Sequence, residues 1–265
     1  MYSFNYARPG SVTDAVGTAT RAAEAKYLAG GQTLLPTMKQ RLARPGVLID
    51  LQKVPELKGI HIAGNGVGIG AMATHAEVAV HDGVRAAIPA LAKLADGIGD
   101  AQVRHRGTIG GSLANNDPAA DYPAAAMALG ATIITNRRQI PADQYFTGLF
   151  STALEEGELI TAIGFPKPLK SGYAKFEQRA SRYALVGVFV AQTASGVRVA
   201  VTGSGNNGVF RVPAMEQALA ANFSPEAVKG IKVPADDMMG DIHGSAEYRA
   251  ALVTVMAERA VAAAS

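Results

Sequence analysis

Two pairs of adjacent glycines, Gly30-Gly31 and Gly110-Gly111, strongly limit how the chain can fold. Each pair is followed by small polar residues and then by a segment with helix-like spacing of apolar residues. Glycine lets the backbone adopt positive φ and approach a ligand closely, so consecutive amides can converge on an anion. A helix that begins beside such a loop adds the positive end of its dipole. One pair alone is more often a turn than a site, but the two together predict facing loops around an anionic group.

The order of the predicted elements favours an α+β fold. Helices are expected over 11–26, 74–81, 85–95, 117–129 and 245–264, and a further helix is expected to begin after Thr33 as its N-cap. Strands are expected over 27–31, 47–51, 131–135, 185–192 and 197–203. Asn65-Gly66 is expected to form the turn of a β-hairpin. Helices and hairpins mix without a regular strand-helix-strand alternation, which argues against a doubly wound parallel sheet. The Pro/Gly/Lys stretch GFPKPLKSG places a domain boundary near residue 170.

The composition narrows the classes of function. With 265 residues, 48% of them hydrophobic and 18% charged, the chain has an ordinary globular composition. The sequence contains no cysteine, so it can supply neither disulfides nor thiolates to a metal or an iron–sulfur cluster, and any redox centre must be an organic cofactor. The net charge is +3, but the basic residues are scattered, so no nucleic-acid partner is expected. No apolar run is long enough for a transmembrane segment and no secretion signal is apparent, so we expect a cytoplasmic protein.

One segment matches a dinucleotide-binding pattern. The stretch VRVAVTGSGNNGVF places Gly203, Gly205 and Gly208 as G-x-G-x-x-G behind a predicted strand. Pro213 falls where the long helix of a nicotinamide-binding unit should run, and no acidic residue is convincingly placed about twenty residues on. A connecting turn is the favoured interpretation.

Four segments, in order along the chain, closely resemble the FAD-binding medium subunits of molybdenum hydroxylases: AGGQTLLPTMKQRLARPGVLIDL, GAMATHAEV, VRHRGTIGGSLANNDPAADYPAAAMALGA and QYFTGLFSTALEEGELITAI. That family includes the medium chain of carbon monoxide dehydrogenase and the flavin domain of xanthine dehydrogenase. The resemblance implies an FAD-binding domain of the vanillyl-alcohol-oxidase type over 1–168, with two α+β subdomains over about 1–55 and 56–168. A small C-terminal α+β domain over 169–265 follows.

The resemblance also implies a set of FAD-binding residues: Leu28, Ala29, Gly30, Gly31, Gln32, Thr33, Leu34, His75, Thr108, Ile109, Gly110, Gly111, Ser112, Asn115, Asp121 and Tyr183. The two glycine loops would hold the pyrophosphate through amides and hydroxyls, Asn115 and Asp121 would hold the nucleotide half, and His75 and Tyr183 would lie near the flavin. A core role for His75 stays open. Arg182 stands where many relatives carry an acid, which leaves any flavin-tuning role of that acid in doubt.

The function implied by the resemblance is electron transfer by FAD. In this family a large subunit oxidises the substrate at its molybdenum cofactor, and the electrons pass through 2Fe–2S clusters of a small subunit. The chain would receive these electrons and pass them to an external electron acceptor, within a dimer of heterotrimers. No catalytic residue and no metal ligand is assigned, because the flavin carries the chemistry. Two alternatives stay open: a stand-alone FAD-dependent oxidoreductase on the same fold, and an assembly module without flavin. Tyr122, Tyr145, Phe146 and Phe150 are expected to pack in the core.

Overall fold

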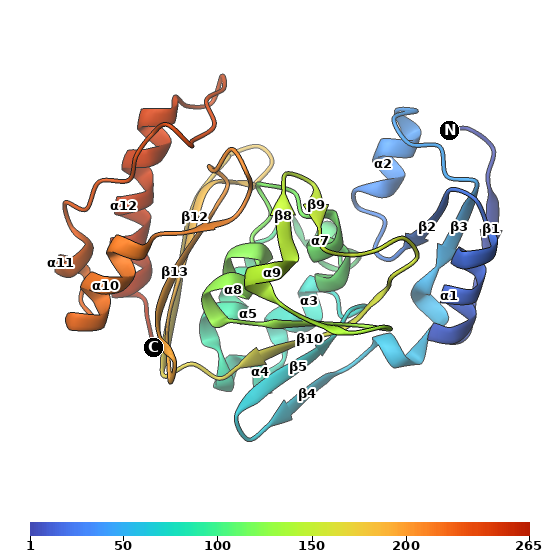
Figure 1. Ribbon diagram of the computed structural model, residues 1–265, viewed down its shortest axis with the longest axis horizontal. Coiled ribbons are helices and arrows are strands. Elements are labelled where there is room, and N and C mark those ends of the chain that lie inside the picture. The colour runs from blue at the N-terminus through green and yellow to red at the C-terminus, as the bar shows by residue number, and fades with distance from the viewer.

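The computed structural model describes residues 1–265, which form an N-terminal, a central and a C-terminal unit along the long axis of the molecule (Figure 1). Each unit has its own main sheet, and helices cover the sheets. No helix has the length and apolar character needed to span a membrane. The mixed helix and strand content confirms the α+β prediction.

The N-terminal unit is a three-stranded parallel sheet in the order β1-β3-β2. Its elements are β1 (Asn5–Ala7), α1 (Val12–Arg21), β2 (Ala25–Leu28), α2 (Leu34–Lys39) and β3 (Val47–Asp50), followed by 3-10 turns at Leu51–Lys53 and Pro55–Leu57. The predicted cap Ser11 accepts a hydrogen bond from the backbone of Asp14 at 3.1 Å. Helix α1 ends earlier than predicted, because β2 begins at Ala25 and pairs along β3.

Helix α2 starts as predicted after Thr33, but the Thr33 side chain makes no capping hydrogen bond. The predicted capping by its hydroxyl is therefore wrong. Thr33 has helical backbone angles, φ −107° and ψ −52°, instead of the extended angles that let a capping side chain reach back to the helix.

The central unit is built on a five-stranded antiparallel sheet in the order β4-β5-β10-β6-β7. Its elements are β4 (Ile60–Ala63), β5 (Gly66–Gly70), α3 (His75–Val80), α4 (Asp82–Ala87), α5 (Pro89–Asp96), α6 (Ala101–Arg104), α7 (Ile109–Asn115), α8 (Tyr122–Leu129), β6 (Thr132–Thr135), β7 (Gln139–Pro141), α9 (Ala142–Tyr145), β8 (Phe146–Gly148), β9 (Ser151–Thr152) and β10 (Ile160–Pro166). The predicted hairpin is confirmed, and Ala63 pairs with Gly66 around it. Pro89 divides the helix predicted over 85–95 into α4 and α5, because proline lacks the N–H that an uninterrupted helix needs there.

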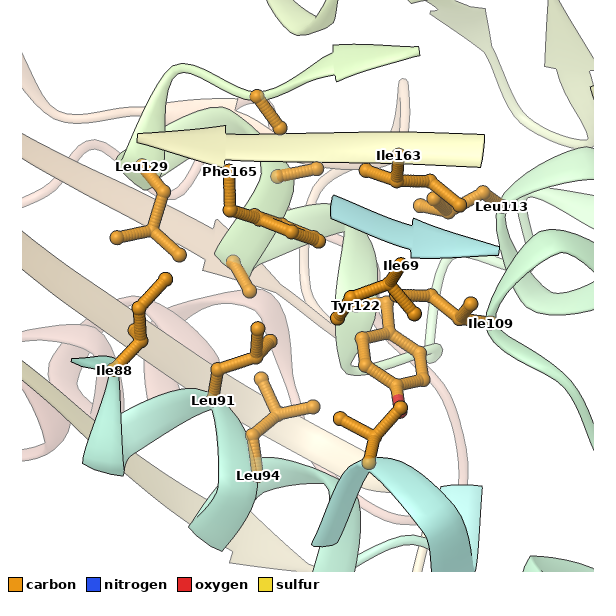
Figure 2. Packing of buried hydrophobic residues seen from close by; sticks show 14 of the residues in the cluster. Ile69, Ile88, Leu91, Leu94, Ile109, Leu113, Tyr122, Leu129, Ile163 and Phe165 are labelled. Carbon is orange, nitrogen blue, oxygen red and sulfur yellow. The ribbon is translucent and has the colours of Figure 1, made fainter. Parts of the chain in front are cut away.

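Helices pack on this sheet through the largest hydrophobic cluster of the protein. Figure 2 shows Ile69 and Phe165 from the sheet facing Leu91 from α5 and Tyr122 from α8. Burial of apolar side chains of this kind contributes roughly 1.5–3 kcal/mol for each large residue. The cluster holds helices α7 and α8, and thus the segment between them, rigidly against the sheet.

The helix predicted over 117–129 is wrong at its start. Asp117 closes a turn by accepting a hydrogen bond from the backbone of Ala119 at 2.9 Å. Helix α8 begins only at Tyr122, with Asp121 as the N-cap residue and Pro123 in the first turn. Asp117-Pro118 and Asp121-Tyr122-Pro123 both place an aspartate before a proline that suits the first turn of a helix, and packing in the core selects the second.

The C-terminal unit is an antiparallel sheet in the order β11-β12-β13-β14. Its elements are β11 (Lys170–Glu177), β12 (Ala184–Thr193), β13 (Gly196–Thr202), β14 (Phe210–Arg211), α10 (Pro213–Ala221), α11 (Pro225–Val228) and α12 (Ala246–Ala262). One face packs on α10 and α12. The other face, which includes Tyr173 and Phe189, joins the cluster of the central unit.

The G-x-G-x-x-G segment forms the predicted connecting turn between β13 and β14. Gly203 and Gly208 have φ of +88° and +91°, conformations that favour glycine. No helix follows the strand until α10 at Pro213. The segment lacks the strand-to-helix geometry of a dinucleotide site.

Candidate functional site

A cleft of about 520 Å³ lies at the junction of the N-terminal and central units. Its walls come from the β2–α2 loop, helix α7, the start of α8 and the hairpin between β11 and β12. All but one of the predicted cofactor-binding residues line it: Leu28, Ala29, Gly30, Gly31, Gln32, Thr33, Leu34, His75, Thr108, Gly110, Gly111, Ser112, Asn115, Asp121 and Tyr183. Residues from four separate stretches of the chain thus share one concave surface, as expected of a ligand site.

The loop at residues 29–34 contributes free backbone amides to this surface. None of the amides of these residues donates a hydrogen bond to another protein group. Gly31 has a φ of +73°, which a residue with a side chain adopts only with strain. The first amides of a helix have no partner within the helix, and here they lie together with the amides of the glycine loop at the cleft, so this run of unpaired donors is suited to a ligand with several acceptor oxygens.

Gly30 has a structural reason to lack a side chain. A Cβ placed on Gly30 would lie 2.0 Å from the carbonyl oxygen of Arg106. A Cβ on Gly107 would lie 2.5 Å from Nε2 of His75. Gly30 therefore lets the first loop approach the segment before α7, and Gly107 lets that segment approach His75.

The second diglycine pair lies in the first turn of helix α7, which corrects the prediction of a facing loop. Thr108 is the N-cap, and its hydroxyl accepts a hydrogen bond from the amide of Gly111 at 3.1 Å. The neighbouring amides are also used inside the protein: Ile109 donates to Ala73, Gly110 to Ala71 and Ser112 to Thr108. The prediction that this segment offers amides to a ligand is therefore wrong for residues 109–112. It offers the hydroxyls of Thr108 and Ser112.

Ile109 is the one predicted site residue outside the cleft lining. Its side chain is completely buried in the hydrophobic cluster of the central unit (Figure 2). Ile109 therefore anchors helix α7 to the sheet and presents no group to a ligand.

His75 combines a place in the cleft wall with deep burial. Its side chain packs against Tyr122, with ring centroids 5.4 Å apart, and the residue is 5% exposed. Burial, reinforced by the positive charge of Arg104, lowers the pKa of His75 to about 4. The ring is therefore neutral at pH 7. Nδ1 of His75 and the hydroxyl of Tyr122 are both buried without a hydrogen-bond partner in the protein.

Asp121 is a buried carboxylate with one oxygen in use. Its Oδ1 accepts a hydrogen bond from the hydroxyl of Tyr173 and forms an ion pair with Nζ of Lys175 at 2.9 Å. Its Oδ2 makes no hydrogen bond within the protein. Burial raises the pKa of the Asp121 carboxyl, and the Lys175 ammonium and the hydrogen bonds oppose that rise.

Comparison with known proteins agrees with this geometry. Residues 2–168 match the family described as the FAD binding domain in molybdopterin dehydrogenase. The chain belongs to this family. Its membership confirms the prediction of an oxidoreductase subunit with FAD as the cofactor.

The similarity to known proteins extends over nearly the full length of this flavoprotein chain. The nicotine 6-hydroxylase medium subunit of Paenarthrobacter nicotinovorans is 37% identical, over 98% of this chain and 96% of that protein. The carbon monoxide dehydrogenase medium chain of Hydrogenophaga pseudoflava is likewise 37% identical over 98% and 96%. A solved structure of reconstituted carbon monoxide dehydrogenase from Oligotropha carboxidovorans matches with a TM-score of 0.90 at 34% identity, covering 99% of this chain and 97% of that one. The chain is thus similar throughout to medium subunits of molybdenum hydroxylases.

The structure of the flavoprotein chain also shows which site residues the sequence did not reveal. Lys175 and Tyr173 reach Asp121 from strand β11, and Glu158 lines the cleft from the loop before β10. The alternation of Tyr173 and Lys175 along a strand was the available signal, since both must then face the same way. Their partners lie too far away in sequence for that signal to identify them.

Tyr183 and Arg182 stand at the rim of the cleft. Tyr183 is 49% exposed, and Arg182 adopts a φ of +60° in the β11–β12 hairpin. The guanidinium of Arg182 donates a long hydrogen bond of 3.4 Å to the carbonyl of Gly99. Among the aromatic residues expected in the core, Tyr122 and Tyr145 are fully buried and Phe146 is partly buried against the central cluster, whereas Phe150 is 61% exposed, so the core prediction is wrong for Phe150.

Proposed function

We propose that this chain is the FAD-carrying electron-transfer subunit of a heteromeric molybdenum hydroxylase, in which bound FAD takes electrons from 2Fe–2S clusters of a partner subunit and passes them to an external acceptor. The observation that carries the proposal is the run of unpaired amides at residues 29–34, which line the cleft of a chain that belongs to an FAD-binding family. FAD carries a diphosphate, whose oxygens match a row of convergent N–H donors.

The chain's own residues bind and orient the cofactor in this proposal. The amides of residues 29–34 bind the diphosphate, and the hydroxyls of Thr33 and Ser112, which make no hydrogen bond in the protein, add donors. Oδ2 of Asp121 accepts a hydrogen bond from a ribose or ribityl hydroxyl. His75 stays neutral because of its low pKa and adds no charge to the cleft. No side chain is assigned as a catalytic acid or base, since the flavin supplies the redox chemistry.

Partner subunits are part of the proposal. The sequence contains no cysteine, so this chain cannot ligate a 2Fe–2S cluster of the usual type. Similar proteins are named as medium subunits or medium chains, which supports a small iron–sulfur partner and a large molybdenum-cofactor partner. A dimer of such heterotrimers and a cytoplasmic location complete the proposed assembly.

The proposed domain arrangement assigns residues 1–168 to an FAD domain of the vanillyl-alcohol-oxidase type, with subdomains over about 1–55 and 56–168. Residues 169–265 form the second domain. The cleft at the junction of the N-terminal and central units supports this division, because ligand sites form preferentially at such junctions. The β11–β12 hairpin gives the second domain a share in the cleft wall.

Purification of the tagged chain from its native host tests the proposed role. We expect two further subunits to co-purify, one with iron–sulfur absorption and one with molybdenum by metal analysis, and we expect substrate of the large subunit to bleach the flavin absorption anaerobically. A flavin-containing chain that purifies alone and oxidises a substrate by itself would favour the stand-alone oxidoreductase. A colourless chain that purifies with the other subunits would favour the assembly module.

A further inference from the structure

A buried lysine holds together three segments of the cleft wall. Nζ of Lys175 donates to the carbonyl oxygens of Gly97 at 2.9 Å and Arg182 at 3.0 Å, and it lies 2.9 Å from Oδ1 of Asp121. The side chains of Lys175 and Asp121 are 7% and 5% exposed. An ammonium has three donors, and all three are used here.

The three segments come from different parts of the fold. Gly97 follows helix α5, Asp121 precedes α8, and Arg182 lies in the hairpin between β11 and β12. Each segment contributes directly to the cleft, through Gly99, Asp121 and Arg182. Lys175 is therefore one contact that joins the C-terminal sheet to the central unit, and it lies beside the ligand surface.

The contacts of Lys175 also determine which carboxylate oxygen of Asp121 remains available. Lys175 and Tyr173 both bind Oδ1, so rotation of the carboxylate is restrained and Oδ2 keeps its acceptor capacity. Tyr173 and Lys175 alternate along β11 and reach the same carboxylate, while the intervening Ala174 packs in the cluster of α10 and α12. A buried ion pair costs desolvation free energy, because both charges lose their hydration. The location of this pair at the cleft argues for a role in binding.

We propose, building on the proposed function, that Lys175 is a positioning residue for the cofactor: it aims Oδ2 of Asp121 at a hydroxyl of the FAD ribose or ribityl chain and fixes the 178–183 hairpin as the wall beside it. Lys175 acts through Asp121 and through the hairpin and does not itself contact the cofactor.

The electrostatic surroundings of Asp121 agree with this role. Burial raises the pKa of its carboxyl, and the charge of Lys175 is the largest opposing influence. The hydroxyl of Tyr173 donates to the carboxylate, and burial raises the pKa of the Tyr173, Tyr122 and Tyr183 phenols, so these groups stay uncharged and add no negative charge near Asp121. Lys175 is the cation in contact with Asp121, and its charge favours the ionised carboxylate.

The test uses the full-length chain freed of flavin and titrated with FAD, with binding followed by flavin fluorescence and by circular dichroism of the flavin bands. We expect Lys175→Met and Asp121→Asn each to weaken FAD binding by about 10- to 100-fold, the range of a lost charged hydrogen bond. The double variant should weaken binding by less than the product of the two single effects, because both act on one contact. Lys175→Gln, which keeps donors for the carbonyls but removes the charge, provides a second variant if Lys175→Met does not fold.

Arg249 offers a matched control. It is a buried cation that also donates to two carbonyl oxygens, of Leu185 and Gly203, and pairs with one carboxylate, Asp241, but it does not line the cleft. Arg249→Met should lower thermal stability without changing the FAD dissociation constant or the flavin dichroism.

The outcomes separate the two proposals. If wild-type chain binds FAD and the Lys175 variants bind it with unchanged affinity and dichroism, the positioning role is overturned while the proposed function stands. Equal losses in the Lys175 and Arg249 variants, or multiplicative effects of Lys175→Met and Asp121→Asn, also overturn it, since they indicate a general loss of stability or independent contacts. Failure of the wild-type chain to bind FAD contradicts the proposed function itself.

Discussion

His75 should make the flavin-free protein sensitive to mild acid. Its folded-state pKa of about 4 lies below the ordinary value of 6.5, because the ring is buried and Arg104 adds a like charge. The unfolded chain therefore binds a proton at His75 in a pH range where the folded chain does not. The resulting stability is fully present above pH 6.5 and is lost as pH falls from 6.5 to 4.

The size of the effect follows from the shift. A difference of about 2.5 pKa units corresponds to about 3 kcal/mol at 1.36 kcal/mol per unit. The residue is only 5% exposed, so screening by solvent reduces this value little. At pH 7, His75→Leu should change stability only slightly, because the variant loses a ring whose Nδ1 has no partner.

Urea unfolding of flavin-free protein, followed by far-UV circular dichroism between pH 7 and pH 4, measures this contribution. We expect the stability difference between wild type and His75→Leu to shift by about 3 kcal/mol across that range, with the variant becoming relatively more stable at low pH. His61→Leu, at an exposed position on β4, serves as the control for replacing a histidine by leucine. Parallel pH profiles for wild type and His75→Leu would refute the reasoning that His75 is held neutral.

Three further perturbations have outcomes that the structure predicts. Glu158 has a fully buried side chain beside Arg138, and the hydrogen bond from that arginine is the main reason that its pKa is lowered to about 2. The ionised carboxylate stabilises the folded chain above pH 4.5, and this stabilisation is lost as pH falls to 2. In urea unfolding, Glu158→Gln should therefore lower the free energy of unfolding by about 2–3 kcal/mol at pH 7 and by almost nothing at pH 2. Gly31→Ala should weaken FAD binding at least about tenfold in a fluorescence titration, because the new Cβ would be strained at φ +73° and would lie 2.8 Å from Leu35; Gly230→Ala, at φ +85° in open space, should leave FAD binding unchanged. Asn116→Ala should destabilise the protein by about 2–4 kcal/mol in thermal unfolding, since this buried residue has a φ of +44° and its side chain donates hydrogen bonds to the carbonyls of Gly148 and Ser151. Asn116→Gly should cost less than Asn116→Ala, because glycine removes the backbone strain but not the loss of the two hydrogen bonds. Equal costs for the two Asn116 variants would contradict a strain contribution.

Local sequence signals predicted the elements that depend on local chemistry. The hairpin at Asn65-Gly66, the cap at Ser11 and the closing helix α12 each rest on turn residues, capping residues or apolar spacing, and each is confirmed. The first glycine loop is also recognisable from sequence, because positive φ at Gly31 and a polar continuation toward a helix are local properties.

Features that depend on packing were beyond those signals. Gly110 and Gly111 resemble a loop in sequence, yet they form a helical turn, in which the missing side chain of Gly110 lets α7 approach Ala71. Asp117 and Asp121 are equivalent as helix starts until the burial of Tyr122 in the core chooses between them. Lys175 could not be assigned a role from sequence, because its three acceptors come from distant parts of the chain.

The proposed role of this chain rests on the binding of the FAD diphosphate by the amides of residues 29–34. Parallel titrations of the flavin-free chain with FAD and with FMN, which has the same ring and ribityl chain but lacks the diphosphate bridge and the adenosine, test it most directly. We expect one FAD per chain and an FMN dissociation constant at least about 100-fold higher, corresponding to about 3 kcal/mol from the contacts that FMN lacks. A further titration with ADP, which carries the diphosphate without the flavin, should show competition with FAD. Equal affinities for FAD and FMN, together with no competition by ADP, would contradict the claim.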